Sequence, residues 1–127
     1  MSAELNLLGE RVIGAALRVH TTLGPGLLES SYEICLHHEL VKAGLAVKRQ
    51  SPLPVLYDGI QLDAGYRLDL LVEDRLVVEL KTVERLQPIH TAQLLSYLKL
   101  GDYRLGYLLN FHVISLRDGI KRVVNNL

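Results

Sequence analysis

The stretch Tyr66–Lys81, YRLDLLVEDRLVVELK, decides the fold of this 127-residue chain. It reads as two short apolar strands joined by a polar turn. Alternation along a strand puts leucines and valines on one face, and it leaves Asp69, Glu79 and Lys81 on the other. Three charged residues in what should be a core hairpin therefore need an explanation.

The length of the turn sets how the two strands pair. A two-residue turn would place Asp69 opposite Val78 and would mix charged and apolar side chains on both faces. A three-residue loop, residues 73–75, pairs Asp69 with Glu79 and leaves one face wholly apolar. We therefore predict this register, in which the apolar cross-strand pairs are Leu70 with Val78 and Leu68 with Leu80.

Two carboxylates that face each other across a hairpin destabilise it unless a cation lies between them. Lys81, two residues after Glu79, points to the same face as both acids. A hard divalent cation held by carboxylate oxygens, with the lysine beside it, would resolve the arrangement. A solvated sheet face with an ordinary ion pair explains the same three charges, and the hairpin alone favours neither interpretation.

The composition predicts one globular domain over residues 1–127, because 49% of the residues are hydrophobic and 22% are charged. The formal net charge is zero, so no overall basic field indicates a nucleic-acid partner. Cys35 is the only cysteine, which excludes a disulfide framework and a thiolate metal cluster. With no signal peptide and no apolar run long enough to cross a bilayer, we expect a cytoplasmic protein.

Hydrophobic spacing predicts an α/β (α+β) chain of helices and short strands. The helices are predicted at residues 5–23, 27–41 and 89–100. Outside the hairpin, the strands are predicted at residues 45–50, 52–57, 60–66, 104–111, 112–116 and 120–124. Asp58-Gly59 is predicted as a hairpin turn, as is the 117–119 segment between the last two strands. Pro52 and Pro54 indicate that their part of the sheet lies at an edge.

Four polar residues of the helices are also candidates for a site. Glu29 lies in the first turn of the second predicted helix, where the helix dipole stabilises an acid by about 0.3–1 kcal/mol. Tyr32 lies on roughly the same face and suits either the core or a site. Gln93 and Tyr97 are four residues apart in the third helix and therefore share a face. Taken singly, all four are explained as well by helix ends, core packing or solvent exposure.

Three groups of residues together resemble known nuclease motifs. Gly26–Tyr32, GLLESSY, resembles the pattern that names the GxxExxY protein family. Asp69 with Glu79-Leu80-Lys81 resembles the core of the PD-(D/E)xK nucleases, although Leu68 replaces the proline. Gln93–Tyr97, QLLSY, resembles the QxxxY signature of the branch that includes RecB-type and Cas4-type nuclease domains. The order and spacing of the three groups are more specific than any one of them.

This resemblance implies a restriction-endonuclease-like core, in which helices flank a central mixed β-sheet. The carboxylates that it assigns to Mg²⁺ or Mn²⁺ are Asp69, Glu79 and Glu29. It implies that Lys81 orients or helps to deprotonate the attacking water, or stabilises charge on the scissile phosphate. The residues that it assigns to substrate binding or to support of the lysine are Gln93, Tyr97 and Tyr32.

Two functions from different classes follow from these residues. The first is a metal-dependent nuclease that hydrolyses phosphodiester bonds of nucleic acid, with DNA as the expected substrate and a homodimer expected by analogy. The second is a catalytically silent nucleic-acid-binding or protein-interaction module on the same fold. The complete set of three acids and Lys81 favours the nuclease, because a module without turnover has no physical reason to keep opposed carboxylates in its sheet. The neutral net charge supports the second function.

We predict that Asp69 and Glu79 are cross-strand neighbours on the face opposite the leucines and valines of the hairpin. We also predict that Glu29 points at them from the start of the second helix, although it is distant in the sequence. A structure with Asp69 opposite Val78, or with Glu29 on the far side of the sheet, would contradict these predictions.

Overall fold

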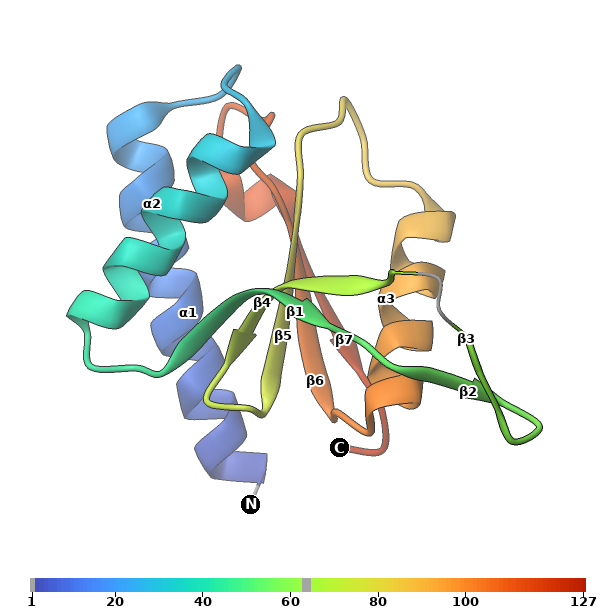
Figure 1. Cartoon of the computed structure of the whole chain (residues 1–127). Helices are drawn as coiled ribbons and strands as arrows, with labels where there is room; N and C mark the ends of the chain where they lie inside the picture. The colour runs from blue at the N-terminus through green and yellow to red at the C-terminus, as the bar shows by residue number, and fades with distance from the viewer. Residues whose placement is uncertain (1, 63–64) are drawn as a thin grey trace.

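A five-stranded sheet lies between two helical layers in the computed structural model, which describes residues 2–62 and 65–127 (Figure 1). The helices are α1 (Ser2–Leu23), α2 (Glu29–Lys42) and α3 (Pro88–Gly101). The strands are β1 (Val47–Pro52), β2 (Val55–Tyr57), β3 (Ile60–Leu62), β4 (Arg67–Val72), β5 (Leu76–Lys81), β6 (Leu105–Asn110) and β7 (Ile120–Val124). Helices α1 and α2 cover one face of the sheet and α3 covers the other. The predicted α+β class with a flanked central sheet is confirmed.

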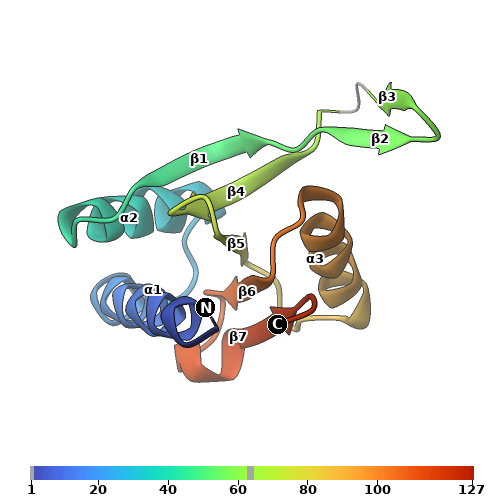
Figure 2. The same ribbon diagram turned by 90° about the horizontal axis from the view of Figure 1, so that it is seen from below.

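The sheet has the strand order β1-β4-β5-β6-β7 and is mixed. Strands β5 and β6 are parallel, because α3 carries the chain back across the sheet between them, and the other pairs are antiparallel. Strand β1 lies at an edge, as its proline indicates. Strands β2 and β3 form a separate hairpin that extends away from the rest of the molecule (Figure 2). The hairpin turn predicted at Asp58 and Gly59 is confirmed, and both residues have positive φ.

The central hairpin has the predicted register. Leu70 pairs with Val78, and the turn between β4 and β5 consists of residues 73–75. Glu73 and Asp74 hold φ angles of 55° and 54°, so two left-handed residues close the loop. This pairing places Asp69 and Glu79 at the next position of the hairpin.

Both faces of the central hairpin are buried, and Leu68 does not lie on the predicted face. Leu70 and Val78 pack with α1 and α2, whereas Leu68 packs in the cluster beneath α3. The prediction for Leu68 is wrong because strand alternation is interrupted at Asp69. The residue beside Asp69 on β1, Gln50, has a left-handed φ of 49°, although the pairs on either side keep their register.

The chain after β6 also differs from the prediction. Residues 112–115 are not a strand, and a 3-10 helix, η1 (Leu116–Gly119), leads into β7, which pairs with β6. The buried side chain of Asn110 ends β6, because its Oδ1 accepts the N–H groups of Val83 and His112 at 3.1 and 3.2 Å. A Cβ on Gly119 would collide with the carbonyl oxygen of Asn110, so the glycine permits this return.

Tyr32 lies in the core and closes the connection between α1 and α2. Its side chain is fully buried, and its ring stacks on Phe111 with the centroids 4.5 Å apart. The hydroxyl donates to the carbonyl oxygen of Gly24 at 2.6 Å and accepts the N–H of Leu27 at 3.1 Å. Tyr32 therefore holds the loop that precedes Glu29.

Among the residues that the structure describes, none of the helices has the length and apolar character needed to span a membrane.

Replacing Tyr32 by phenylalanine should keep the ring stacking but leave two partly buried backbone groups, the carbonyl of Gly24 and the N–H of Leu27, without their hydrogen-bond partner. We expect Tyr32→Phe to lower the free energy of unfolding by about 1–3 kcal/mol, measured by chemical denaturation. Tyr107→Phe is the matched control, because the structure shows no hydrogen bond from that buried tyrosine's hydroxyl to a described residue. Equal changes in the two variants would contradict the role given to the Tyr32 hydroxyl.

Candidate active site

Asp69 and Glu79 meet where β4 and β5 separate. The regular backbone pairing of these strands ends at Leu70 and Val78. Beyond it, Glu79 Oε2 accepts the N–H of Asp69 at 2.7 Å, and Asp69 Oδ2 accepts the N–H of Leu80 at 2.9 Å. We call this pair of acids, with its two hydrogen bonds, the carboxylate clamp. The hydrogen bonds fix both acids in the sheet and satisfy the backbone N–H groups of Asp69 and Leu80.

Burial and mutual repulsion dominate the electrostatics of the clamp. Burial, and next the charge of Asp69, raise the pKa of Glu79 from 4.5 to about 8, against the opposing effects of the Asp69 N–H and Lys81. Burial also raises the pKa of Asp69, while the N–H of Leu80 lowers it. Glu79 thus tends to keep its proton at neutral pH when no cation is bound. Strongly perturbed acids in contact are a common mark of a functional site.

Lys81 ends β5 two residues after Glu79 and is partly buried. It pairs with Asn110 of β6, whose side chain also donates to the carbonyl oxygen of Val83 at 2.8 Å. The segment that follows the lysine is therefore held in place. No ion pair within 4.0 Å engages Lys81 in the parts of the chain that the structure describes.

Glu29 begins α2 and is an exposed residue. The pKa of Glu29 is raised by burial and then by the charge of Asp69, while Lys81 lowers it. The carboxylate of Glu29 therefore lies within electrostatic range of Asp69 and Lys81. However, no three His, Cys, Asp or Glu side chains of the described residues lie close enough to share a metal ion directly. The structure brings Asp69 and Glu79 together and leaves Glu29 outside their immediate group.

The two residues of α3 differ in their positions. Tyr97 is partly buried and lies edge-on to Tyr66, with ring centroids 6.0 Å apart. Burial, followed by the charge of Glu79, raises the pKa of Tyr97, so this side chain reaches the surroundings of the clamp. Gln93 lies one turn earlier and is exposed, and no hydrogen bond joins it to another described residue. Tyr32, as shown above, supports the site only through the loop that it closes.

A family model for the PD-(D/E)XK nuclease superfamily matches residues 6–123. The chain belongs to this superfamily. The match covers the clamp, Lys81, both flanking helical layers and nearly all of β7. No curated protein and no solved structure matches the chain. Membership indicates a nuclease that acts on nucleic acid, and nucleases of this superfamily generally use divalent metal ions.

Three residues beside the clamp were not singled out by the sequence. Glu33 of α2 is buried, and its Oε2 accepts a hydrogen bond from Arg49 Nε at 3.2 Å and lies 3.1 Å from Arg49 Nη2. Gln50 Nε2 donates to Glu33 Oε1 at 2.7 Å and to Asp69 Oδ1 at 3.3 Å. One signal for Glu33 was present, because an acid on the same helical stripe as Leu36 and Leu40 needs a buried partner. Nothing in the sequence pattern pointed to Gln50.

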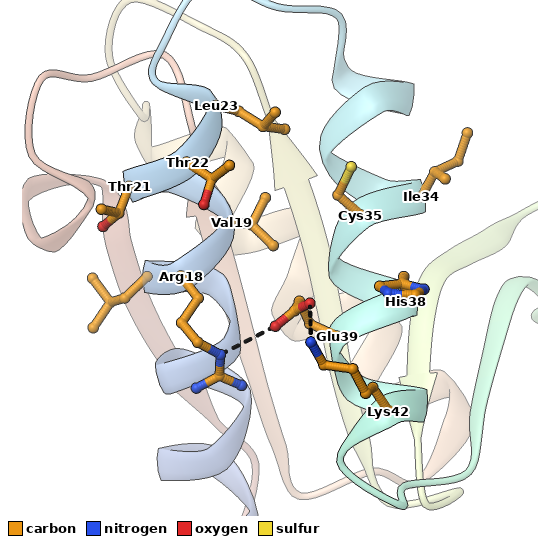
Figure 3. Close-up of a pocket in the computed structure, with 11 residues that line it drawn as sticks. Arg18, Val19, Thr21, Thr22, Leu23, Ile34, Cys35, His38, Glu39 and Lys42 are labelled. Atoms are coloured by element: carbon orange, nitrogen blue, oxygen red, sulfur yellow. Dashed lines mark hydrogen bonds and ion pairs between the residues drawn. The ribbon is translucent and has the colours of Figure 1, made fainter.

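A groove of about 780 Å³ lies elsewhere, between the end of α1 and helix α2 (Figure 3). Arg18 and Lys42 flank its Glu39, at 3.2 and 3.3 Å. None of the residues that line this groove belongs to the clamp or its neighbours. The candidate active site is therefore defined by buried charge and by hydrogen bonds, and not by the shape of the surface.

The clamp has the chemistry of a site for a hard divalent cation. Its donors are carboxylate oxygens, which Mg²⁺ and Mn²⁺ prefer over softer metals. Two carboxylates with several waters are a usual set for Mg²⁺, so the pair suffices without a third direct protein ligand. The raised pKa values of Asp69 and Glu79 indicate unfavourable negative charge that a bound dication would offset.

The pKa of Glu79 predicts how stability depends on pH in the metal-free protein. The native state keeps the Glu79 proton up to a pH of about 8, whereas the unfolded chain releases it near 4.5. The native state therefore binds more protons across this interval, and its stability falls as the pH rises. Glu79→Gln removes this loss, so its stability advantage over the wild type should grow between these two pH values. The difference in unfolding free energy between the two proteins is measured by chemical denaturation in EDTA at several pH values.

Glu39→Gln is the matched control for this pH dependence. Hydrogen bonds from Arg18 and then Lys42 lower the pKa of Glu39, so its contribution has the opposite sign and is lost as the pH falls. Unfolding free energies of wild type and Glu79→Gln that run parallel across the interval would contradict the buried, protonated state of Glu79.

Proposed function

We propose that the protein is a Mg²⁺- or Mn²⁺-dependent nuclease that hydrolyses phosphodiester bonds, with DNA as its substrate. The observation that carries the proposal is the carboxylate clamp, in which the buried Glu79 and the partly buried Asp69 face each other, with Lys81 two residues after Glu79. Burying Glu79 beside Asp69 costs stability, and a module that only binds a partner gains nothing from that cost. A nuclease gains a metal site from it.

Each residue of the site has a role that suits this reaction. Asp69 and Glu79 would bind the metal, and Glu29 would reach the same ion through a bound water. The ion, when bound, supplies a Lewis acid for the phosphoryl oxygen and makes water more acidic. Lys81 would place its ammonium group near the attacking water or the charge that develops on the phosphate. Its lack of an ion pair with a described residue leaves that group available.

The aromatic and amide groups of α3 would contact the substrate. Tyr97 lies beside Tyr66 at the edge of the clamp, where the pair offers a surface for a nucleotide. Gln93, exposed one turn earlier, would donate to the phosphate backbone. This arrangement supports a place in the QxxxY branch and in the GxxExxY family. We further propose that two copies act together on double-stranded DNA, by analogy with nucleases that cut both strands.

Loss of the lysine tests the catalytic assignment. Lys81→Ala should lower the cleavage rate by at least about 100-fold, because it removes a preorganised cation from the site of developing charge. The assay uses single- and double-stranded DNA and RNA with Mg²⁺ or Mn²⁺. Lys121→Ala is the matched control, since Lys121 is an exposed lysine of β7. Wild-type rates in Lys81→Ala on every cleaved substrate would refute the role of this lysine.

Metal binding is tested separately by thermal unfolding. Mg²⁺ or Mn²⁺ should raise the Tm of the wild type, and it should leave Asp69→Asn and Glu79→Gln unchanged, because a ligand that binds only the native state stabilises it. Without metal, Glu79→Gln should be as stable as the wild type or more so, since a single acceptor oxygen satisfies its one hydrogen bond. Asp69→Asn should gain less, because Asp69 accepts two hydrogen bonds with two different oxygens.

Neither variant should cleave DNA under these conditions. An unchanged wild-type Tm in the presence of metal, together with lower Tm values for both variants, would show that the two acids only stabilise the hairpin and that the clamp is not a metal site.

A further inference from the structure

Gln50 holds an unusual backbone conformation beside the clamp. Its φ of 49° lies in the left-handed region, which costs a residue with a side chain free energy. In the described residues, the other non-glycine positions with positive φ are Asp58, Glu73, Asp74, Asp102 and Asn126. All of these lie in turns or at the ends of elements, whereas Gln50 is inside strand β1. Strain of this kind points to a function when a specific contact depends on it.

The side chain of Gln50 joins two carboxylates from different layers of the molecule. Its Nε2 donates to Glu33 Oε1 at 2.7 Å and to Asp69 Oδ1 at 3.3 Å. Glu33 is a firm anchor because it is 5% exposed and forms an ion pair with Arg49 Nη2 at 3.1 Å. With the N–H of Leu80 on its Oδ2, Asp69 then has a hydrogen bond on each oxygen, so the plane of its carboxylate is set.

The chemistry of the carboxamide suits a neighbour of a metal ligand. A glycine or an asparagine would adopt the left-handed backbone at lower cost, so backbone geometry alone does not account for a glutamine. A lysine or arginine here would neutralise Asp69 and compete with a bound cation. An amide donates to both acids without adding charge, and it leaves the negative charge of Asp69 for the cation.

We propose that Gln50 is a positioning residue for Asp69, held by the Glu33–Arg49 pair, and that it sets the affinity of the clamp for its divalent ion. This inference rests on the proposed function. Hydrogen-bond partners of metal ligands typically change metal affinity by about 10- to 100-fold when they are removed. The left-handed backbone of Gln50 then allows its single side-chain amide to reach both Glu33 and Asp69.

Gln50→Gly separates the side chain from the backbone. Glycine accepts the left-handed conformation, so the metal-free variant should unfold at the same urea concentration as the wild type or at a higher one. Its affinity for Mn²⁺, measured by isothermal titration calorimetry, should fall by about 10- to 100-fold. Asp58→Gly is the matched control, because Asp58 has a φ of 50° in the distant β2–β3 turn. It should keep the wild-type affinity.

Gln50→Asn gives a second measurement if Gln50→Gly fails to fold. Asparagine tolerates the same backbone but is one methylene shorter, so it should show a similar loss of Mn²⁺ affinity. Wild-type affinity in either folded variant would overturn the role of Gln50 and leave the proposed function standing. If the wild type binds no Mn²⁺, both the role of Gln50 and the proposed function are overturned. The Asp58→Gly protein would then bind no Mn²⁺ either.

Discussion

Asp69 and Glu79 each accept a backbone N–H from the neighbouring strand, and this exchange is the constraint on which the site depends. Opposed acids would otherwise repel each other and separate the hairpin. Here each acid satisfies a backbone donor that the interrupted ladder leaves free. The repulsion remains, and it is expressed as raised pKa values rather than as a broken hairpin. The sheet thus holds charge that the fold alone does not need.

The surrounding elements all serve to keep this charged pair in place. Helix α2 brings Glu29 and Glu33 to one side of it, and Tyr32 holds the loop from which that helix starts. Helix α3 carries the chain from β5 to β6, so Lys81 ends a central strand beside the buried Asn110. The clamp lowers the stability of the fold, and the two apolar clusters on either side of the sheet offset this cost.

The position of Leu68 shows how the site alters the sheet around it. Regular alternation would place Leu68 with Leu70, but it lies in the cluster beneath α3. The change of face coincides with Asp69 and with the left-handed Gln50 on the neighbouring strand. Sheet regularity is therefore lost at the same residue where the hydrogen-bonding of the clamp begins.

The sequence alone determined the two strands of the central hairpin and the register in which they pair. Its apolar alternation and three polar turn residues permit only one pairing that keeps charge off the face packed against α1 and α2, and this pairing put Asp69 and Glu79 together. The prolines indicated an edge strand, and the glycines after the first two helices marked helix ends that the structure shares. These features are local, so the spacing of residues along the chain suffices to predict them.

Only the tertiary structure decided how the acids are held and what lies beside them. The hydrogen bonds of the clamp join side chains to backbone across strands, and Gln50 reaches Glu33 from a different element. The strand expected at residues 112–116 was lost to a side-chain hydrogen bond of Asn110 that no periodicity reveals. Such contacts depend on the distance between residues far apart in the sequence. Hydrophobic patterning reports which face of an element is buried, but not which polar groups meet there.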